Sequence, residues 1–263
     1  METYNHVLDN ELPEKKQAYW EIALGLQEVD NLKPSEYMRG LVKDHIEGKK
    51  SYEEVTSEIR DYYHLDIASL ESPREVHVVS GSEEADIVAD AIYEILHDSA
   101  FRFDIPTFKN YHFRLFRRLN STVYHPGEFR IVNLTKKEPI LNGKSVQYQD
   151  FGMVEESLTY DFEEEARQNY FEMSQAEKVR RLATFTSRIW QVHPFYEGNT
   201  RTTAIFIEKY LMNMGYEVDN DLLGKHAKEF RDALVLANYT SVPDGIQASL
   251  ERLEKFIERM MER

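Results

Sequence analysis

The residues best suited to chemistry lie in one segment, His193 to Thr202, with the sequence His-Pro-Phe-Tyr-Glu-Gly-Asn-Thr-Arg-Thr. The flanking sequence predicts that this segment joins two buried helices. A loop that leads into a helix presents unpaired backbone N–H groups and the positive end of the helix dipole, and both favour a bound anion. Gly198 allows a ligand to approach the backbone closely, and Arg201 offers a fork of donors that matches phosphate oxygens.

Three more side chains of this segment suit phosphate chemistry. Asn199 adds a hydrogen-bond donor, and Glu197 provides an oxygen ligand suited to Mg²⁺, which proteins commonly share with substrate phosphates. His193 can be neutral near pH 7 and can accept a proton. Taken together, these residue types predict phosphoryl or nucleotidyl transfer.

Each feature also has a structural explanation when it is taken alone. A histidine before a proline can simply end a helix, and a Gly-Asn pair forms an ordinary turn. Glu197 and Arg201 lie four residues apart, and such a surface ion pair contributes less than about 1 kcal/mol. The combination of all these features in one short segment between two helices favours the chemical interpretation.

Helical periodicity dominates the rest of the chain and predicts an all-α fold. Ser174 and Glu177 form a capping box that opens the helix before the segment, and a new helix begins near Thr200. Asn142-Gly143 lies between β-prone runs and predicts a tight turn, hence a small β-hairpin around residues 138–148. Further helices are predicted at 14–27, 35–46, 52–63, 83–97 and 108–119, with two or three more towards the C-terminus.

Composition limits the classes of partner. The 263 residues carry a formal net charge of −15, which repels phosphate backbones and anionic membranes, so we expect neither nucleic acid nor a membrane as partner. Cysteine is absent, which excludes disulfides and agrees with a reducing cytoplasm. No stretch approaches the ~20 apolar residues that a spanning helix requires, and Met1 to Lys16 lacks the apolar core of a signal peptide. These observations predict a soluble, cytoplasmic protein.

The segment resembles the motif of the Fic (Fic/Doc) family, H-P-F-x-[D/E]-G-N-G-R-x-x-R. The matching positions are His193, Pro194, Phe195, Glu197, Gly198, Asn199 and Arg201. Upstream, Phe108–Phe116 and Tyr124–Arg130 are similar to the helix and the Ala-Gly-x-x-Arg segment that precede a flap in these domains. The likeness extends over residues 83–240, so we divide the chain into an N-terminal helical segment at 1–70, for which a regulatory role is considered, and a Fic domain at 71–263.

What the resemblance implies is a helical bundle whose β-hairpin flap lies beside the active-site loop, and transfer of AMP from ATP to a Tyr, Thr or Ser hydroxyl of a target protein. His193 would be the general base, and Glu197 would hold Mg²⁺. The phosphates would lie in a cradle made by Gly198, Asn199, Thr200 and Arg201. The target would dock on the flap as an added strand, at Ile140, Leu141, Ser145, Val146 and Tyr148.

Two positions depart from the family pattern. Thr200 replaces the second motif glycine but keeps its backbone N–H. Ala204 stands where the pattern often has a second arginine, which holds the γ-phosphate in many Fic proteins. The donor is therefore left open, and transfer of UMP, phosphocholine or phosphate on the same fold is an alternative. A non-catalytic binding module is a second alternative, against which the intact His193 and Glu197 argue.

The N-terminal helices resemble the small antitoxin-like segments that accompany some Fic domains, whose inhibitory signature is [S/T]-x-x-x-E-[G/N]. The chain has no strict match, and Leu26–Asn31 is the nearest equivalent. We therefore consider Asp30 as an inhibitory acid directed at the nucleotide site, against the alternative of a solvated helix end. Fic proteins often self-associate, so a homodimer is also left open.

Overall fold

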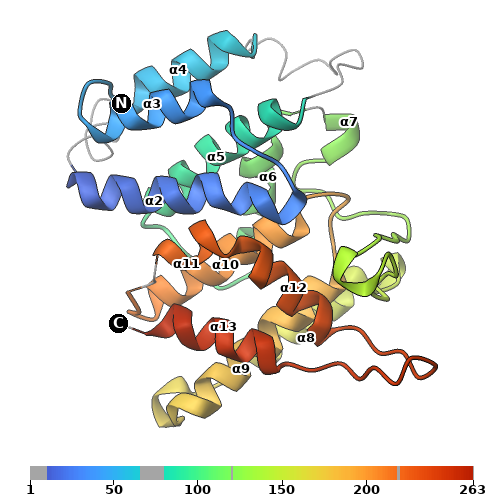
Figure 1. Ribbon diagram of the computed structural model, residues 1–263. Coiled ribbons are helices and arrows are strands. Elements are labelled where there is room, and N and C mark those ends of the chain that lie inside the picture. Colours follow the sequence, from blue (N-terminus) through green and yellow to red (C-terminus); the bar gives the residue numbers. More distant parts are fainter. Residues whose placement is uncertain (1–10, 66–79, 120, 218–219, 263) are drawn as a thin grey trace. The chain divides into compact units, whose positions relative to one another are not determined.

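The computed structural model describes residues 11–65, 80–119, 121–217 and 220–262. Within these residues the fold is all-α, as predicted, and contains no β-strand (Figure 1). Ser241 and Ile246 make an isolated antiparallel bridge. In the described ranges, no helix is both long enough and apolar enough to cross a membrane. The predicted domain boundary between residues 70 and 71 lies outside the described residues.

The chain divides into two compact units, and the first comprises residues 1–100, 113–126 and 220–227. Ser35 and Ser51 cap two of its helices by accepting hydrogen bonds from backbone N–H groups. Trp20 lies in its core, stacked on Tyr93 with ring centroids 4.1 Å apart and donating to His45 Nδ1 at 2.9 Å. Its elements are α2 (Pro13–Gly25), η1 (Leu26–Asp30), α3 (Glu36–Ile46), α4 (Tyr52–Tyr62), α5 (Gly81–His97), α7 (Ser121–Tyr124) and α11 (Asn220–Lys225).

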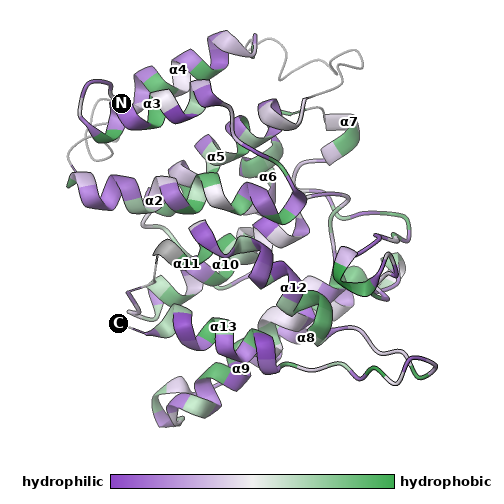
Figure 2. Cartoon of the chain, viewed as in Figure 1, coloured by the Kyte–Doolittle hydropathy of each residue, from purple (hydrophilic) through white to green (hydrophobic). Residues whose placement is uncertain are grey.

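The second unit comprises residues 101–112, 127–219 and 228–263. Aromatic rings fill its core: the centroids of Phe103, Phe162, Phe185 and Phe206 lie 5.1 to 5.9 Å apart where the rings contact. Hydrophobic and hydrophilic residues are interspersed along α9 and α13, as expected for amphipathic helices (Figure 2). Its elements are most of α6 (Ile105–Phe116), η3 (Pro139–Leu141), η4 (Phe151–Met153), α8 (Val154–Ala166), η5 (Tyr170–Glu172), α9 (Gln175–Val192), α10 (Asn199–Asn213), α12 (Ala227–Ala237) and α13 (Glu251–Met261).

The helices predicted from the sequence are confirmed within a few residues. At the start of α9, the Ser174 hydroxyl accepts from the Glu177 N–H while the Glu177 carboxylate accepts from the Ser174 N–H, as the capping box predicts. Helix α8 was not predicted. Its buried face includes two carboxylates, Asp161 and Glu165, which pair with arginines of α9. The same face carries Val154, Leu158 and Phe162 at four-residue spacing, so two of its five buried positions are acidic and the apolar pattern is incomplete.

The predicted β-hairpin around residues 138–148 is wrong as a pair of strands. The tight turn does form, because Asn142 and Gly143 take positive φ angles of 53° and 83°. The turn follows a 3-10 helix, however, and the segments on either side do not pair as a ladder. The backbone bonds across the turn include Glu138 N–H to the Lys144 carbonyl at 2.9 Å and Gly143 N–H to the Glu138 carbonyl at 3.0 Å. We call residues 134–150 the flap.

Candidate active site

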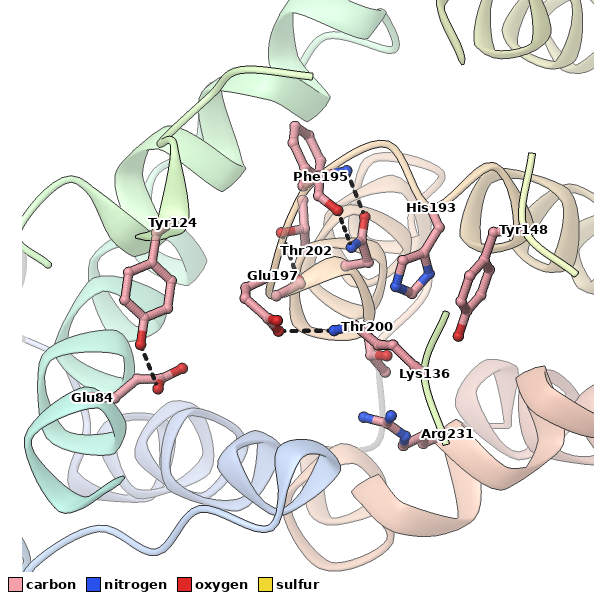
Figure 3. A network of polar contacts seen from close by, with 12 residues as sticks. Glu84, Tyr124, Lys136, Tyr148, His193, Phe195, Glu197, Thr200, Thr202 and Arg231 are labelled. Carbon is pink, nitrogen blue, oxygen red and sulfur yellow. Dashed lines mark hydrogen bonds and ion pairs between the residues drawn. The ribbon is translucent and has the colours of Figure 1, made fainter. Parts of the chain in front are cut away.

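The segment between α9 and α10 is a tightly held loop. Helix α9 ends at His193, whose φ of 49° is left-handed, and α10 starts after Gly198, whose φ of 69° suits glycine. The Asn199 side chain bridges the loop: it accepts from Phe195 N–H at 2.9 Å and donates to the Phe195 carbonyl at 2.8 Å. Thr202 Oγ1 adds a bond of 3.0 Å to the Gly198 carbonyl. The sequence therefore fixes the loop through local side-chain bonds (Figure 3).

His112 of α6 also holds this loop in place, a role that the sequence did not indicate. Its imidazole stacks on Phe195 with centroids 3.8 Å apart and an interplanar angle of 3°. Nε2 lies 3.1 Å from the Glu197 carbonyl, and Nδ1 accepts from Gly127 N–H at 2.9 Å. Burial lowers the pKa of His112 to about 3. The ring is therefore neutral at pH 7, with its proton on Nε2.

His193 is almost completely buried, with 2% of its surface exposed. Its ring stacks on Tyr148 of the flap with centroids 3.8 Å apart, and Trp190 meets it edge-on at 5.5 Å. Nδ1 lies 3.3 Å from the Trp190 carbonyl, an acceptor, so the proton of the neutral ring belongs on Nδ1. Nε2 is buried and has no hydrogen-bond partner among the described residues. Nε2, the nitrogen that can accept a proton, is thus the one without a hydrogen bond to the described residues.

The electrostatic surroundings keep this imidazole neutral. Burial lowers the pKa of His193 well below its usual value, and the positive charge of Lys136 adds to this effect. Arg231 and Arg130 lower the same pKa further, while the hydrogen bond with the Trp190 carbonyl opposes the shift. Three cations therefore face one buried ring, which makes this region of an acidic protein locally suited to an anion.

Glu197, the predicted metal ligand, points its carboxylate at Lys136 Nζ, 2.8 Å away. Its side chain is 44% exposed, so solvent and ions can reach it. Among the described residues, no group of three or more His, Cys, Asp or Glu side chains could hold a metal ion by itself. A single accessible carboxylate does fit Mg²⁺ of the kind that takes most of its ligands from water and substrate phosphates.

The start of α10 has the properties of an anion site, although its side chains are engaged elsewhere. Thr200 Oγ1 accepts from Trp190 Nε1 at 3.0 Å, and the Asn199 amide is committed to the loop. Arg201 is 1% exposed and extends into the interior. In the described part of the chain, no side chain caps this helix. The first backbone N–H groups and the helix dipole are the features that remain for a phosphate.

The flap covers the predicted base. Of the five predicted docking residues, Leu141, Val146 and Tyr148 are buried, while Ile140 and Ser145 are half-buried. Tyr148 is the residue that reaches His193. None of the backbone N–H groups of residues 145–148 takes part in a backbone–backbone hydrogen bond to the described residues. This edge has the unpaired donors that an added strand requires.

Four residues near the loop had no role in the sequence interpretation: Arg130, Lys136, Glu138 and Arg231. Arg130 is 2% exposed, and its guanidinium donates to the carbonyls of His193 at 2.7 Å, Val132 at 2.6 Å, Val192 at 3.3 Å and Gln149. Arg130 ends the segment Tyr124–Arg130 that is similar to Fic domains, and this position was the sequence signal for its role. The other three lie outside any motif.

Asp30, the considered inhibitory acid, ends the 3-10 helix η1 of the first unit and is half-buried. The following residue, Asn31, is left-handed with a φ of 56° and closes the helix. The loop between α9 and α10 belongs to the second unit. The inhibitory role of Asp30 therefore stays a prediction.

Known proteins resemble this chain in sequence family and in fold. Residues 102–211 match the model of the Fic/DOC family. The N-terminal Fic domain of Bep8, a VirB-translocated effector protein from Bartonella sp. 1-1C, superimposes with a TM-score of 0.54 at 17% identity, over 71% of this chain and 88% of that one. The N-terminal Fic domain of a putative cell filamentation protein from Bartonella quintana gives 0.50 at 20% identity, over 67% and 80%. No curated protein matches the sequence.

The second unit is thus a helical domain in which the motif forms the junction of α9 and α10. Residues 102–211, which include the loop between α9 and α10, are therefore similar to the Fic/DOC family. The family covers transfer of AMP, of other nucleoside monophosphates and of phosphocholine.

Proposed function

We propose that this Fic domain transfers AMP from ATP to a Tyr, Thr or Ser hydroxyl of a target protein. The observation that carries the proposal is the buried, neutral imidazole of His193, whose Nε2 has no hydrogen-bond partner among the described residues. His193 lies where α9 ends, at the beginning of the loop that leads into α10. A helix start without a side-chain cap suits a phosphate. The adjacent imidazole suits a hydroxyl that must lose its proton.

His193 acts as the general base in this proposal. Nε2 takes the proton of the target hydroxyl as the hydroxyl oxygen attacks the α-phosphorus. A new oxygen–phosphorus bond forms, the bond to the leaving pyrophosphate oxygen breaks, and AMP remains on the target. The Trp190 carbonyl holds the Nδ1 proton, which keeps the lone pair on Nε2. The first N–H groups of α10 and the dipole of that helix stabilise the charge on the phosphate oxygens.

Mg²⁺ is the proposed metal, and Glu197 is the residue that would hold it. When bound, the ion supplies positive charge that neutralises the phosphates. Lys136 Nζ pairs with the Glu197 carboxylate at 2.8 Å. For the metal ion to bind, the lysine must move away or share the carboxylate with the ion. Lys136 would then be able to contact phosphate oxygens itself.

The closed flap is the resting form in this account. Tyr148 stacks on His193, so a target hydroxyl reaches Nε2 only after the tyrosine moves. A strand of the target, paired with the unbonded N–H groups of residues 145–148, would draw the flap outward. A bound triphosphate would also offset the cations around His193 and raise its pKa towards the range useful for a base.

Incubation with ATP labelled on the α-phosphate tests the proposal, with a lysate or the protein itself as acceptor. Label should appear on protein with the wild type and be lost with His193→Ala, while ATP labelled only on the γ-phosphate should give none. Arg180→Ala is the control on the same helix, because Arg180 is 78% exposed and lies thirteen residues before His193, and it should keep the label. Protein labelled from the γ-phosphate, or equally by His193→Ala, would rule the proposal out.

Because position 204 is uncharged, donors other than ATP must also be tested. Ala204 is completely buried, so α10 offers no second arginine to the terminal phosphates. Mass spectrometry of a target protein modified in a lysate, where other donors are present besides ATP, separates them, because AMP, UMP, phosphocholine and phosphate add different masses. A mass increment other than that of AMP would leave the proposed site unchanged and would identify a different donor.

A further inference from the structure

A triphosphate needs more positive charge than α10 supplies. Arg201 is the cationic side chain in the first turn of α10, and Ala204, one turn further on, is uncharged and completely buried. Charge-assisted bonds from guanidinium groups are the usual way in which proteins hold the oxygens of phosphates. The remaining cations must therefore come from other elements.

Three cations lie near His193, and two of them hold the loop or the proposed metal ligand. Arg130 donates to four backbone carbonyls, which fixes the loop and the flap. Lys136 pairs with Glu197, the proposed metal ligand. Arg231 comes from a different element, α12, and its side chain is 17% exposed. It is the cation whose position suits an incoming anion without undoing the loop.

The Arg231 guanidinium makes a two-pronged hydrogen bond to the Glu138 carboxylate. Its Nε donates to Glu138 Oε2 at 3.2 Å and its Nη2 to Oε1 at 3.1 Å. Glu138 belongs to the flap and is 1% exposed, and Tyr148 directs its hydroxyl at the same carboxylate, 3.3 Å away. Tyr148 in turn stacks on His193. Figure 3 shows the Arg231 guanidinium directed into the region that His193, Thr200 and Lys136 border.

We propose that Arg231 binds the β- and γ-phosphates of the nucleotide and that Glu138 competes with them for its guanidinium. The proposal rests on the proposed function, because it assumes a nucleotide at the start of α10. A carboxylate and a phosphate match the same two-pronged geometry of arginine, so one can replace the other. Release of Glu138 would also remove a partner of Tyr148 and loosen the flap over His193.

The two members of this pair should affect nucleotide binding in opposite directions. Calorimetric titration would use the α,β-methylene analogue of ATP, which is not cleaved, and AMP, which lacks the terminal phosphates. Arg231→Gln should weaken the analogue about tenfold, the loss of one charge-assisted contact, and leave AMP unchanged within about twofold. Glu138→Gln should tighten the analogue, since the competitor loses its charge. Arg231→Lys should restore part of the affinity.

Thermal unfolding measures the contribution of this ion pair to stability separately from its effect on nucleotide binding. Both Arg231→Gln and Glu138→Gln remove the ion pair between Arg231 and the buried carboxylate of Glu138, so both should lower the melting temperature. Lys228→Gln, an exposed cation on the same helix, is the matched control and should change neither property. If both pair variants weaken the analogue alike, or if Arg231→Gln binds it like the wild type, the inference is wrong. If the wild type fails to bind the analogue, the proposed function fails with it.

Discussion

Arg130 should be one of the largest contributors to the stability of the second unit. It donates to four carbonyls, two of which belong to the buried end of α9, His193 at 2.7 Å and Val192 at 3.3 Å. The other two, Val132 and Gln149, lie where water can replace the guanidinium, because Val132 is 46% exposed and Gln149 half-buried. Arg130→Met therefore leaves two acceptors unsatisfied in the interior.

The expected loss follows from those two acceptors. A buried carbonyl that loses a charged donor costs about 1.5 kcal/mol at the lower end of the usual range, so Arg130→Met should lower the free energy of unfolding by about 3 kcal/mol. Arg130→Lys should recover part of it, because an ammonium reaches fewer carbonyls than a planar fork. Arg167→Met removes an arginine that is 64% exposed and pairs with Glu163 and Glu164, and should cost under about 1 kcal/mol.

Urea unfolding followed by tryptophan fluorescence gives these free energies. Trp20 belongs to the first unit and Trp190 to the second, so all variants would be compared in a Trp20→Phe background that reports on Trp190. A loss for Arg130→Met below about 1 kcal/mol, equal to that of Arg167→Met, would refute the argument from buried acceptors.

Three further outcomes follow from the same geometry. The folded pKa of His112 is about 3 against 6.5 when unfolded, so the unfolded state binds the extra proton between these values. Stability should fall on acidification below pH 6.5 by up to about 1.4 kcal/mol per pH unit, and urea titrations of His112→Asn at pH 7, 6 and 5 should lack this component. Thr200→Val removes the acceptor of buried Trp190 Nε1 and should cost about 1–3 kcal/mol, while Thr200→Ser should cost less than half as much; equal losses would contradict this. Ala204→Arg restores the family pattern at a completely buried position and should lower the melting temperature rather than raise transferase activity, since it buries a charge.

The helices could be predicted from the sequence because their caps and apolar faces are local properties. Ser35 and Ser174 cap α3 and α9 as their residue types suggest. Helix α8 could not, since Asp161 and Glu165 are buried by ion pairs with residues far along the chain. Such pairs exist only once the fold has formed.

The flap shows where local propensity fails. Residues 145–148 are β-prone, yet side chains and not a second strand take up the flap's carbonyls: Arg130 donates to Gln149, and Gln191 donates to Gln147. The loop of the site was predicted because its residues are contiguous. Lys136, Glu138 and Arg231 were not, because they reach the loop from two distant segments with no shared motif.

A crystal structure of the complex with Mg²⁺ and the α,β-methylene analogue of ATP tests the central claim most directly. The account predicts the α-phosphate at the first N–H groups of α10, His193 Nε2 facing the side from which a hydroxyl would attack, and Tyr148 lifted from the imidazole. A nucleotide bound elsewhere, or one bound at α10 while the imidazole points away from its α-phosphate, would contradict the account.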